Sequence, residues 1–171
     1  MDLTDINTIR ALLAKYGFHF SKALGQNFLR DAAVPPRIAE AAGLSSKTGV
    51  LEIGPGVGCL TAELARRAAR VVTVEADAAL RPVLAETLRG FENVEVLYAD
   101  VLKLDLRTLV SEHFQDCAET VVCANLPYQI TSPVLAALVK AGCFSRVTVM
   151  VQREVARRGG LRRAAPRRRG G

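Results

Sequence analysis

The sequence predicts an α/β fold with a doubly wound, mostly parallel sheet. Three observations support this prediction. Short apolar runs alternate five times with stretches of helical periodicity along the 171 residues, which is the order of repeated β-α-β units. The runs are apolar throughout, as expected of buried parallel strands. Glycine, acidic or amide residues follow four of the runs, at the edge of the sheet where such folds bind their ligands.

Each predicted element follows from its residue pattern. In the first helix, Ile6, Ile9 and Leu12 recur at helical spacing, and Gly17 can end the helix. The second helix carries two prolines early, where a helix tolerates them, and ends before Gly43. The predicted helices are 5–16, 31–42, 61–67, 78–88, 106–114 and 132–140. The predicted strands are 49–53, 70–75, 93–98, 120–124 and 146–152.

Composition excludes several classes of protein. The chain is 50% hydrophobic but has no run of 18 apolar residues, so no membrane span is expected. The acidic N-terminus lacks the apolar core of a signal peptide, and we therefore expect a cytoplasmic protein. The four cysteines show no CxxC spacing and no neighbouring histidine cluster, so no metal site is expected. His19 and His113 lie in no motif and receive no catalytic role.

Positive charge is concentrated at the C-terminus. Residues 152–171 carry a net charge of +7, whereas the whole chain carries +6. Residues 159–171 are low in complexity and lack an apolar face, so we expect a disordered tail. Such a tail is either a solvated charged segment or an arm that contacts RNA phosphates. We favour the first interpretation.

A glycine-rich turn after the first predicted strand indicates a ligand site. The apolar run ends in Gly54-x-Gly56-x-Gly58, and a helix follows. This arrangement lets bare backbone approach a ligand. NAD, FAD and S-adenosylmethionine (SAM) sites all use such a turn. Here Cys59 stands where the dinucleotide fingerprint needs its third glycine, and Glu52 fits the SAM variant better.

Two carboxylates at the ends of later strands suit a nucleoside ligand. Glu75 lies 21 residues after Gly54, at the tip of the second strand, where it can accept hydrogen bonds from ribose hydroxyls. Asp100 follows the third strand, where it can accept from an adenine amino group. Asp77 and Asp105 lie further along their loops, and we predict them to be solvated surface acids.

The segment Asn125-Leu126-Pro127-Tyr128 after the fourth strand predicts the reaction. The Asn125 side-chain oxygen and the Leu126 carbonyl can accept the two hydrogens of an adenine N6 amino group, which localises the nitrogen lone pair. Pro127 stiffens the turn, and Tyr128 offers a ring for stacking on a flipped base. A methyl group then moves from sulfonium to nitrogen, helped mainly by positioning.

Four segments together resemble the ribosomal RNA adenine N6-dimethyltransferase family, and most resemble its bacterial members that act on 16S rRNA. The four segments are 24–29 (LGQNFL), 52–58 (EIGPGVG), 125–128 (NLPY) and 152–156 (QREVA). The resemblance implies a Rossmann-like SAM-dependent methyltransferase fold with SAM as its cofactor. It also implies dimethylation of two adjacent adenosines in the 3′-terminal hairpin of 16S rRNA, in a 30S precursor particle.

The resemblance also assigns roles to individual residues. Asn27 and Leu29 would help the glycine turn, at Gly54 and Gly56, to hold the methionine portion of SAM. In the same way, the resemblance implies that Glu75 binds the ribose, that Asp100 binds the adenine, and that Asn125 bridges the cofactor and the target base. Residues 18–29 are then expected to form a lid over the cofactor.

The resemblance stops at about Arg158, although the family continues through further strands and a helical RNA-binding domain. We therefore expect a C-terminally truncated or frame-shifted member that lacks that domain. The predicted parts are an N-terminal helix and lid at 1–30, a methyltransferase domain at 31–158 and a tail at 159–171. We expect a monomer that risks aggregation, because the apolar fifth strand would form an exposed edge of the sheet.

Three other functions remain open at this point. A 23S rRNA adenine methyltransferase of the macrolide-resistance type shares the lid and the glycine turn. A non-catalytic RNA-binding protein would depend on the basic tail. An NAD-dependent oxidoreductase is disfavoured by Cys59 and by the segment that begins at Asn125.

Overall fold

The computed structural model describes residues 1–18 and 28–151, except for the side chain of Tyr128. Several sequence predictions therefore lie outside the described residues. They include the cofactor contact of Asn27, the lid over 19–27 and the tail from residue 152 onward. None of the helices in the described ranges is long and apolar enough to cross a membrane.

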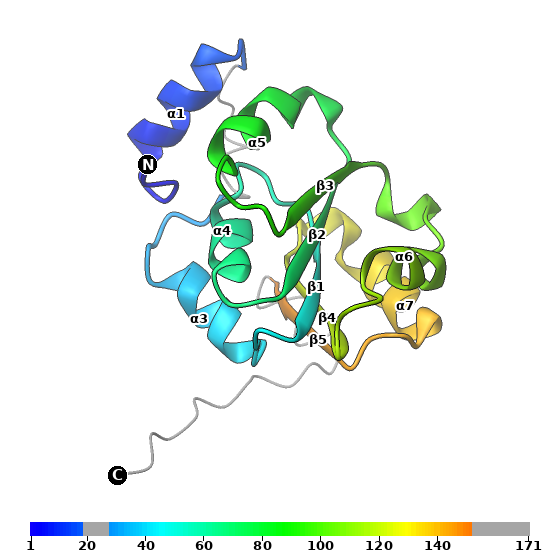
Figure 1. Cartoon of the computed structure of the whole chain (residues 1–171). Helices are drawn as coiled ribbons and strands as arrows, with labels where there is room; N and C mark the ends of the chain where they lie inside the picture. Colours follow the sequence, from blue (N-terminus) through cyan, green and yellow to red (C-terminus); the bar gives the residue numbers. More distant parts are fainter. Residues whose placement is uncertain (19–27, 152–171) are drawn as a thin grey trace.

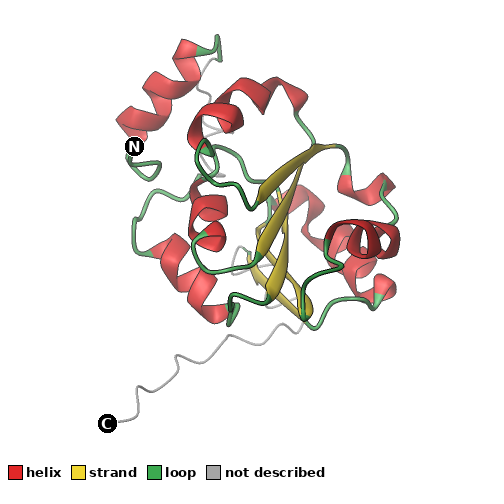
Figure 2. Ribbon diagram, in the orientation of Figure 1, coloured by secondary structure: helices red, strands yellow, loops and turns green. Residues whose placement is uncertain are grey.

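A five-stranded sheet forms the centre of the molecule, as Figures 1 and 2 show. The strand order is β3-β2-β1-β4-β5, and every neighbouring pair is parallel. Parallel strands require crossover connections, and helices or helical turns supply them here. The α/β fold class predicted from the sequence is confirmed.

The observed strands agree closely with the predicted ones, because each is a short, mostly apolar run bounded by polar or glycine residues. The second strand is identical to its prediction, and the other boundaries differ by one or two residues. The strands are β1 (Thr48–Ile53), β2 (Arg70–Glu75), β3 (Val94–Tyr98), β4 (Glu119–Asn125) and β5 (Arg146–Met150).

The helices also follow their predicted positions, and short 3-10 turns precede three of them. The helix after the glycine turn starts two residues earlier than predicted, because Gly58 acts as its N-cap. The helices are α1 (Ile6–Lys15), α3 (Val34–Ala41), α4 (Cys59–Ala65), α5 (Arg81–Thr87), α6 (Leu106–His113) and α7 (Thr131–Ala141). The 3-10 turns are η1 (Ala78–Leu80), η2 (Val101–Lys103) and η3 (Tyr128–Ile130).

Helices cover both faces of the sheet (Figure 2), and the central strands β1, β2 and β4 are buried on both sides. Alternate residues of each strand point to opposite faces. On β1, Leu51 and Ile53 pack in the cluster that includes α6 and α7, whereas Val50 packs in the cluster that includes α3 and α4. This double burial explains why the strands are apolar runs rather than alternating patterns.

The first helix packs beside α5 rather than on the sheet. Ile9, Leu12 and Leu13 of α1 share an apolar cluster with α5 residues. At the end of α1, Lys15 Nζ and the Tyr16 hydroxyl both donate to Glu86 Oε2, at 2.7 Å and 2.5 Å. These contacts fix the chain just before the segment that the structure does not describe.

β5 forms one border of the sheet and pairs with β4 alone within the described ranges. Val147 on this strand keeps 40% of its surface exposed. The segment 147–151 contains no charge, proline or glycine, which are the residues that usually protect an edge strand. The structure thus places the predicted apolar edge at β5.

Candidate functional site

A cavity of about 440 Å³ opens at the carboxyl ends of the strands. It lies beside the junction of β1 and β4. From β1 the chain adds β2 and β3 on one side and later adds β4 and β5 on the other side, and folds of this class bind ligands at this switch point. The residues that line it come from the ends of β1, β2 and β4, from the segments after each strand from β1 to β4 and, at Phe28, from the segment before α3. They are Phe28, Ile53, Gly54, Gly56, Val74, Glu75, Ala76, Asp77, Leu80, Ala99, Asp100, Val101, Leu102, Asn125, Pro127 and Ile130.

The floor of the cavity includes the glycine turn between β1 and α4. Gly54, Gly56 and Gly58 have φ angles of 71°, 58° and 88°, in the left-handed region that other residues avoid. The Gly54 N–H donates to the Val74 carbonyl at 2.9 Å, which holds the turn against β2. A Cβ added at Gly54 would meet no atom within 4 Å, so the turn presents bare backbone to open space.

Glu75 ends β2 and places its carboxylate at the cavity wall. Its Oε1 accepts a hydrogen bond from the Asp77 N–H at 2.9 Å. Burial raises the pKa of Glu75, while the backbone N–H groups of Asp77 and Gly56 oppose that rise. The carboxylate is thus oriented by backbone contacts and faces a ligand-sized space, as the predicted ribose contact requires.

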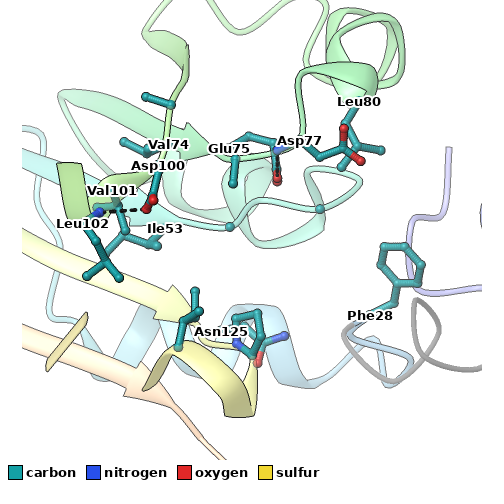
Figure 3. Close-up of a pocket in the computed structure, with 16 residues that line it drawn as sticks. Phe28, Ile53, Val74, Glu75, Asp77, Leu80, Asp100, Val101, Leu102 and Asn125 are labelled. Carbon is teal, nitrogen blue, oxygen red and sulfur yellow. Dashed lines mark hydrogen bonds between the residues drawn. The ribbon is translucent and has the colours of Figure 1, made fainter. Parts of the chain in front are cut away.

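Asp100 follows β3 and lines the same cavity. Its Oδ1 accepts from the Leu102 N–H at 3.0 Å, so the side chain caps the η2 turn (Figure 3). Its second oxygen lies 3.9 Å from Lys103 Nζ, an exposed pair of little energetic weight. The cap holds Asp100 at the strand end with its side chain toward the cavity.

Asn125 is the last residue of β4 and lies across the cavity from Glu75 (Figure 3). The turn that follows is held at both ends. The Leu126 N–H donates to the Met150 carbonyl of β5 at 3.1 Å. The Pro127 carbonyl accepts from the Thr131 hydroxyl at 2.9 Å and from the Ile130 N–H at 3.2 Å. The backbone around Asn125 is therefore fixed by two elements.

The charge of the cavity is one-sided. Three of its lining residues are acidic, namely Glu75, Asp77 and Asp100. No lysine, arginine or histidine is among the described residues that line the cavity. The remaining lining residues are mostly apolar. Such a site favours a ligand with apolar parts and positive charge, and it disfavours a pyrophosphate group.

The structure brings most of the predicted site residues to one place. Gly54, Gly56, Glu75, Asp100, Asn125 and Pro127 all line the cavity. Leu29 is instead buried among α3 and α4 residues. The Leu126 side chain is buried in the core, so only the backbone of Leu126 is available at the turn. The backbone of Tyr128 opens η3, but its ring lies outside the description.

Ten of the sixteen lining residues were not among the predicted site residues, and Phe28, Leu102 and Asp77 are three of these ten. Phe28 closes one end of the cavity and would lie 3.4 Å from a Cβ at Gly56. Leu102 keeps 43% of its surface exposed although it is apolar, and the cavity explains this exposure. Asp77 is exposed as predicted but also lines the cavity and caps η1. The sequence signal that could have placed Asp77 at the cavity was its position two residues after Glu75, the acid at the end of β2.

Other possible sites are less developed. Within residues 1–18 and 28–151, no group of three or more histidine, cysteine, aspartate or glutamate residues could hold a metal ion. Asp105 caps α6 by accepting from the Thr108 N–H, as a surface acid would. The cavity at the strand ends thus remains the best-formed site.

Comparisons with known proteins agree with this geometry. Residues 17–169 match the family described as ribosomal RNA adenine dimethylase. The match extends past Arg158, where the sequence alone predicted that the resemblance stops. A curated relative, ribosomal RNA small subunit methyltransferase A of Bacillus licheniformis, is 48% identical over 156 residues. The alignment covers 91% of this chain and 53% of the relative, so the chain spans about half the length of the curated relatives it matches.

Solved structures give the same result. The 23S rRNA methyltransferase ErmE superimposes with a TM-score of 0.64 at 37% identity, over 75% of this chain and 49% of that one. A dimethyladenosine transferase from Plasmodium falciparum gives a TM-score of 0.61 at 29% identity, over 77% of this chain and 46% of that one. The match to the family covers well over half of the sequence. The chain therefore belongs to the ribosomal RNA adenine dimethylase family.

Proposed function

We propose that this chain forms the cofactor-binding part of a SAM-dependent adenine N6,N6-dimethyltransferase. Its substrate would be two adjacent adenosines in the 3′-terminal hairpin of 16S rRNA, within a 30S precursor particle. The proposal combines family membership with the similarity to relatives named small subunit methyltransferase A. The observation that carries the cofactor assignment is the composition of the cavity.

The cavity fits SAM better than it fits a dinucleotide. SAM has a net positive charge from its sulfonium, an apolar purine and an aliphatic chain. The lining residues offer three carboxylates and an apolar wall, with no basic group to neutralise the pyrophosphate of NAD or FAD. The bare backbone at Gly54 leaves room for close approach of the ligand.

Several residues of the cavity have separate roles in this proposal. The Glu75 carboxylate accepts hydrogen bonds from the ribose hydroxyls, and Asp100 accepts from the adenine amino group. Gly54 and Gly56 hold the methionine portion, and the family resemblance adds Asn27 from the N-terminal segment; Leu29 would act only indirectly, since its side chain is buried against α3 and α4. Leu102 and Val101 offer apolar surface beside the purine, since both line the same wall as Asp100.

The turn after β4 would prepare the target base. Bound SAM supplies an electrophilic methyl group. The Asn125 side-chain oxygen and the Leu126 carbonyl accept the two hydrogens of the adenine N6 amino group and so localise its lone pair. Pro127 and the contacts at its carbonyl hold these two acceptors in place. Tyr128 stacks on the flipped base. The chain thus contributes mainly orientation.

We further propose that this chain binds SAM but transfers methyl groups weakly by itself. It spans about half the length of the curated relatives it matches, and the cavity described above lies within that half. RNA affinity depends on many phosphate contacts, and only part of the relatives' surface is available here.

Two measurements test the proposal. Calorimetry of the purified chain with SAM, and with NADH as a control, should show binding of SAM alone. Methyl transfer from labelled SAM should be offered to 30S precursor particles and to particles that contain 23S rRNA. Weak labelling of the 30S particle supports the assignment, whereas preferred labelling of 23S rRNA would favour the function of ErmE. NADH binding without SAM binding would overturn the cofactor assignment.

A further inference from the structure

A buried carboxyl group lies directly behind the glycine turn. Glu52 is on β1, two residues before Gly54, and only 1% of its surface is exposed. It is not among the residues that line the cavity. Acidic side chains are rarely buried unless a specific partner compensates the loss of water. The proposed function gives Glu52 no role, so its burial needs another explanation.

The partner of Glu52 lies on the other side of the turn. The Thr61 hydroxyl donates to Glu52 Oε2 at 2.6 Å, and both residues are buried. Thr61 is in the first turn of α4, whereas Glu52 is near the end of β1. One side-chain hydrogen bond therefore joins the strand that enters the glycine turn to the helix that leaves it.

The turn between these two residues needs such a link. Glycine has the largest conformational freedom of any residue, and three glycines in left-handed conformations make the turn costly to order. Backbone hydrogen bonds hold its ends, from Gly54 N–H to Val74 and from Gly58 N–H to Pro55. The Glu52–Thr61 bond adds a constraint across the whole turn.

A neighbouring threonine provides an internal comparison. Thr73 on β2 is the register partner of Glu52 and is buried as fully as Thr61. Its hydroxyl makes no hydrogen bond within the part of the chain that the structure describes. Thr73 and Thr61 thus share residue type and burial, and both lie beside Glu52, but only Thr61 is bonded to Glu52 and spans the turn.

We infer that Glu52 and Thr61 are positioning residues that hold the glycine turn in the shape that receives the cofactor. They act through the backbone of Gly54 and Gly56 without touching the ligand. The inference rests on the proposed function for the identity of the ligand. The shape of the turn itself can be tested without any ligand.

The first test uses the affinity for SAM, measured by calorimetry well below the melting temperature of each variant. Thr61→Val keeps the shape of the side chain but removes the donor, and we expect the Kd to rise about tenfold. Thr61→Ser restores a hydroxyl, and Glu52→Gln keeps an acceptor, so both should remain within about threefold of wild type. Thr73→Val is the matched control and should leave the Kd unchanged.

The second test needs no cofactor. Hydrogen exchange of the amides at Gly54 and at residues 56–58 in the free chain reports the order of the turn. Thr61→Val should speed this exchange at least tenfold, and Thr73→Val should not. Equal effects of the two valine variants, or wild-type exchange in Thr61→Val, would overturn the inference. If exchange responds as expected but wild type does not bind SAM, the proposed function fails while the positioning role stands.

Discussion

The two turns that face each other across the cavity are built in different ways. The turn after β1 depends on left-handed glycines and on a buried bond between Glu52 and Thr61. The turn after β4 contains no residue with positive φ; a proline and two bonds to the Pro127 carbonyl shape it. The first turn therefore depends on interior contacts, whereas the second depends on local backbone chemistry.

The two turns also differ in what supports them from outside. Val74, in the protected strand β2, anchors the first turn. Met150 anchors the second through the Leu126 N–H, and Met150 belongs to the border strand β5. The half of the site proposed to hold the cofactor is thus set in the core. The half proposed to hold the target base depends on the least protected strand that the structure describes.

The largest expected effect concerns pH and the first turn. Burial raises the pKa of Glu52 from 4.5 to about 7, against the opposing effect of the Thr61 hydroxyl that donates to it. Because the folded protein binds this proton more tightly than the unfolded chain, Glu52 favours folding at low pH. That contribution is lost as pH rises from 4.5 to about 7. The loss should approach about 3 kcal/mol of unfolding free energy.

Glu52→Gln removes this titration. The variant should match wild type near pH 5 and exceed it in unfolding free energy at pH 8, as measured by urea denaturation. The other titratable groups near Glu52 are Glu75, Cys59 and Cys123. Burial raises the pKa of both thiols, so they stay neutral in this range. Exposed Glu92 provides the control, since Glu92→Gln should leave the pH profile unchanged. Parallel profiles for wild type and Glu52→Gln would contradict the prediction.

The next effect in size concerns Glu75. Glu75→Gln keeps the size of the side chain but replaces the charged carboxylate, which is proposed to accept hydrogen bonds from the ribose, with a neutral amide. Loss of a charged acceptor costs about 2 kcal/mol, or roughly thirtyfold in Kd for SAM, measurable by calorimetry. Glu112→Gln, on the exposed face of α6, is the control and should bind SAM as wild type does. Unchanged affinity in Glu75→Gln would remove Glu75 from the site.

A smaller effect is expected from alanine substitution of glycines with positive φ, and it should differ between the glycine turn and a glycine elsewhere. Gly56 and Gly142 have nearly equal φ angles of 58° and 60°, but only Gly56 lines the cavity. Alanine at either position should lower the unfolding free energy by about 1–2 kcal/mol. Only Gly56→Ala should also weaken SAM binding, because its Cβ would be added to the lining of the cavity, beside Phe28. Equal SAM affinities of the two variants would show that the turn tolerates this change.

The smallest expected effect concerns the border strand. Val147→Lys places a charge on the edge of β5 and should reduce self-association, as measured by light scattering over a range of concentrations. Its effect on unfolding free energy should stay within about 0.5 kcal/mol, since Val147 is largely exposed. Val139→Lys on α7 is the matched control, because Val139 is 79% exposed but lies on no strand edge. If both variants reduced self-association equally, the cause would be a general gain in solubility and not the edge of β5.

Sequence alone predicted the parts of the fold that depend on local pattern. The run at 70–75 is apolar and ends in Glu75, so both its type and its limits were readable. Asn125 was placed just beyond its strand, but it pairs with Met150 as the last strand residue. That extension depends on the neighbouring strand and not on the residue itself. The order of strands in the sheet was likewise not evident from the sequence.

The candidate site divides in the same way. Gly54, Glu75, Asp100 and Asn125 were predictable because the carboxyl ends of parallel strands must lie at one edge. Phe28 lay within the lid predicted over 18–29, but its individual contact with the cavity could not be predicted, because it depends on how a distant N-terminal segment folds back. The bond from Thr61 to Glu52 was also not predictable, since it requires the exact path of the glycine turn.

The strand order has a consequence for synthesis of the chain. β1, β2 and β3 are neighbours in the sheet and follow one another in sequence, so they can pair as they leave the ribosome. β4 must then add to the free side of β1, and β5 must add to β4. Until residue 119 emerges, the apolar edge of β1 has no partner. The cofactor side of the protein is therefore assembled first, and the exposed border of the sheet moves outward with each new strand.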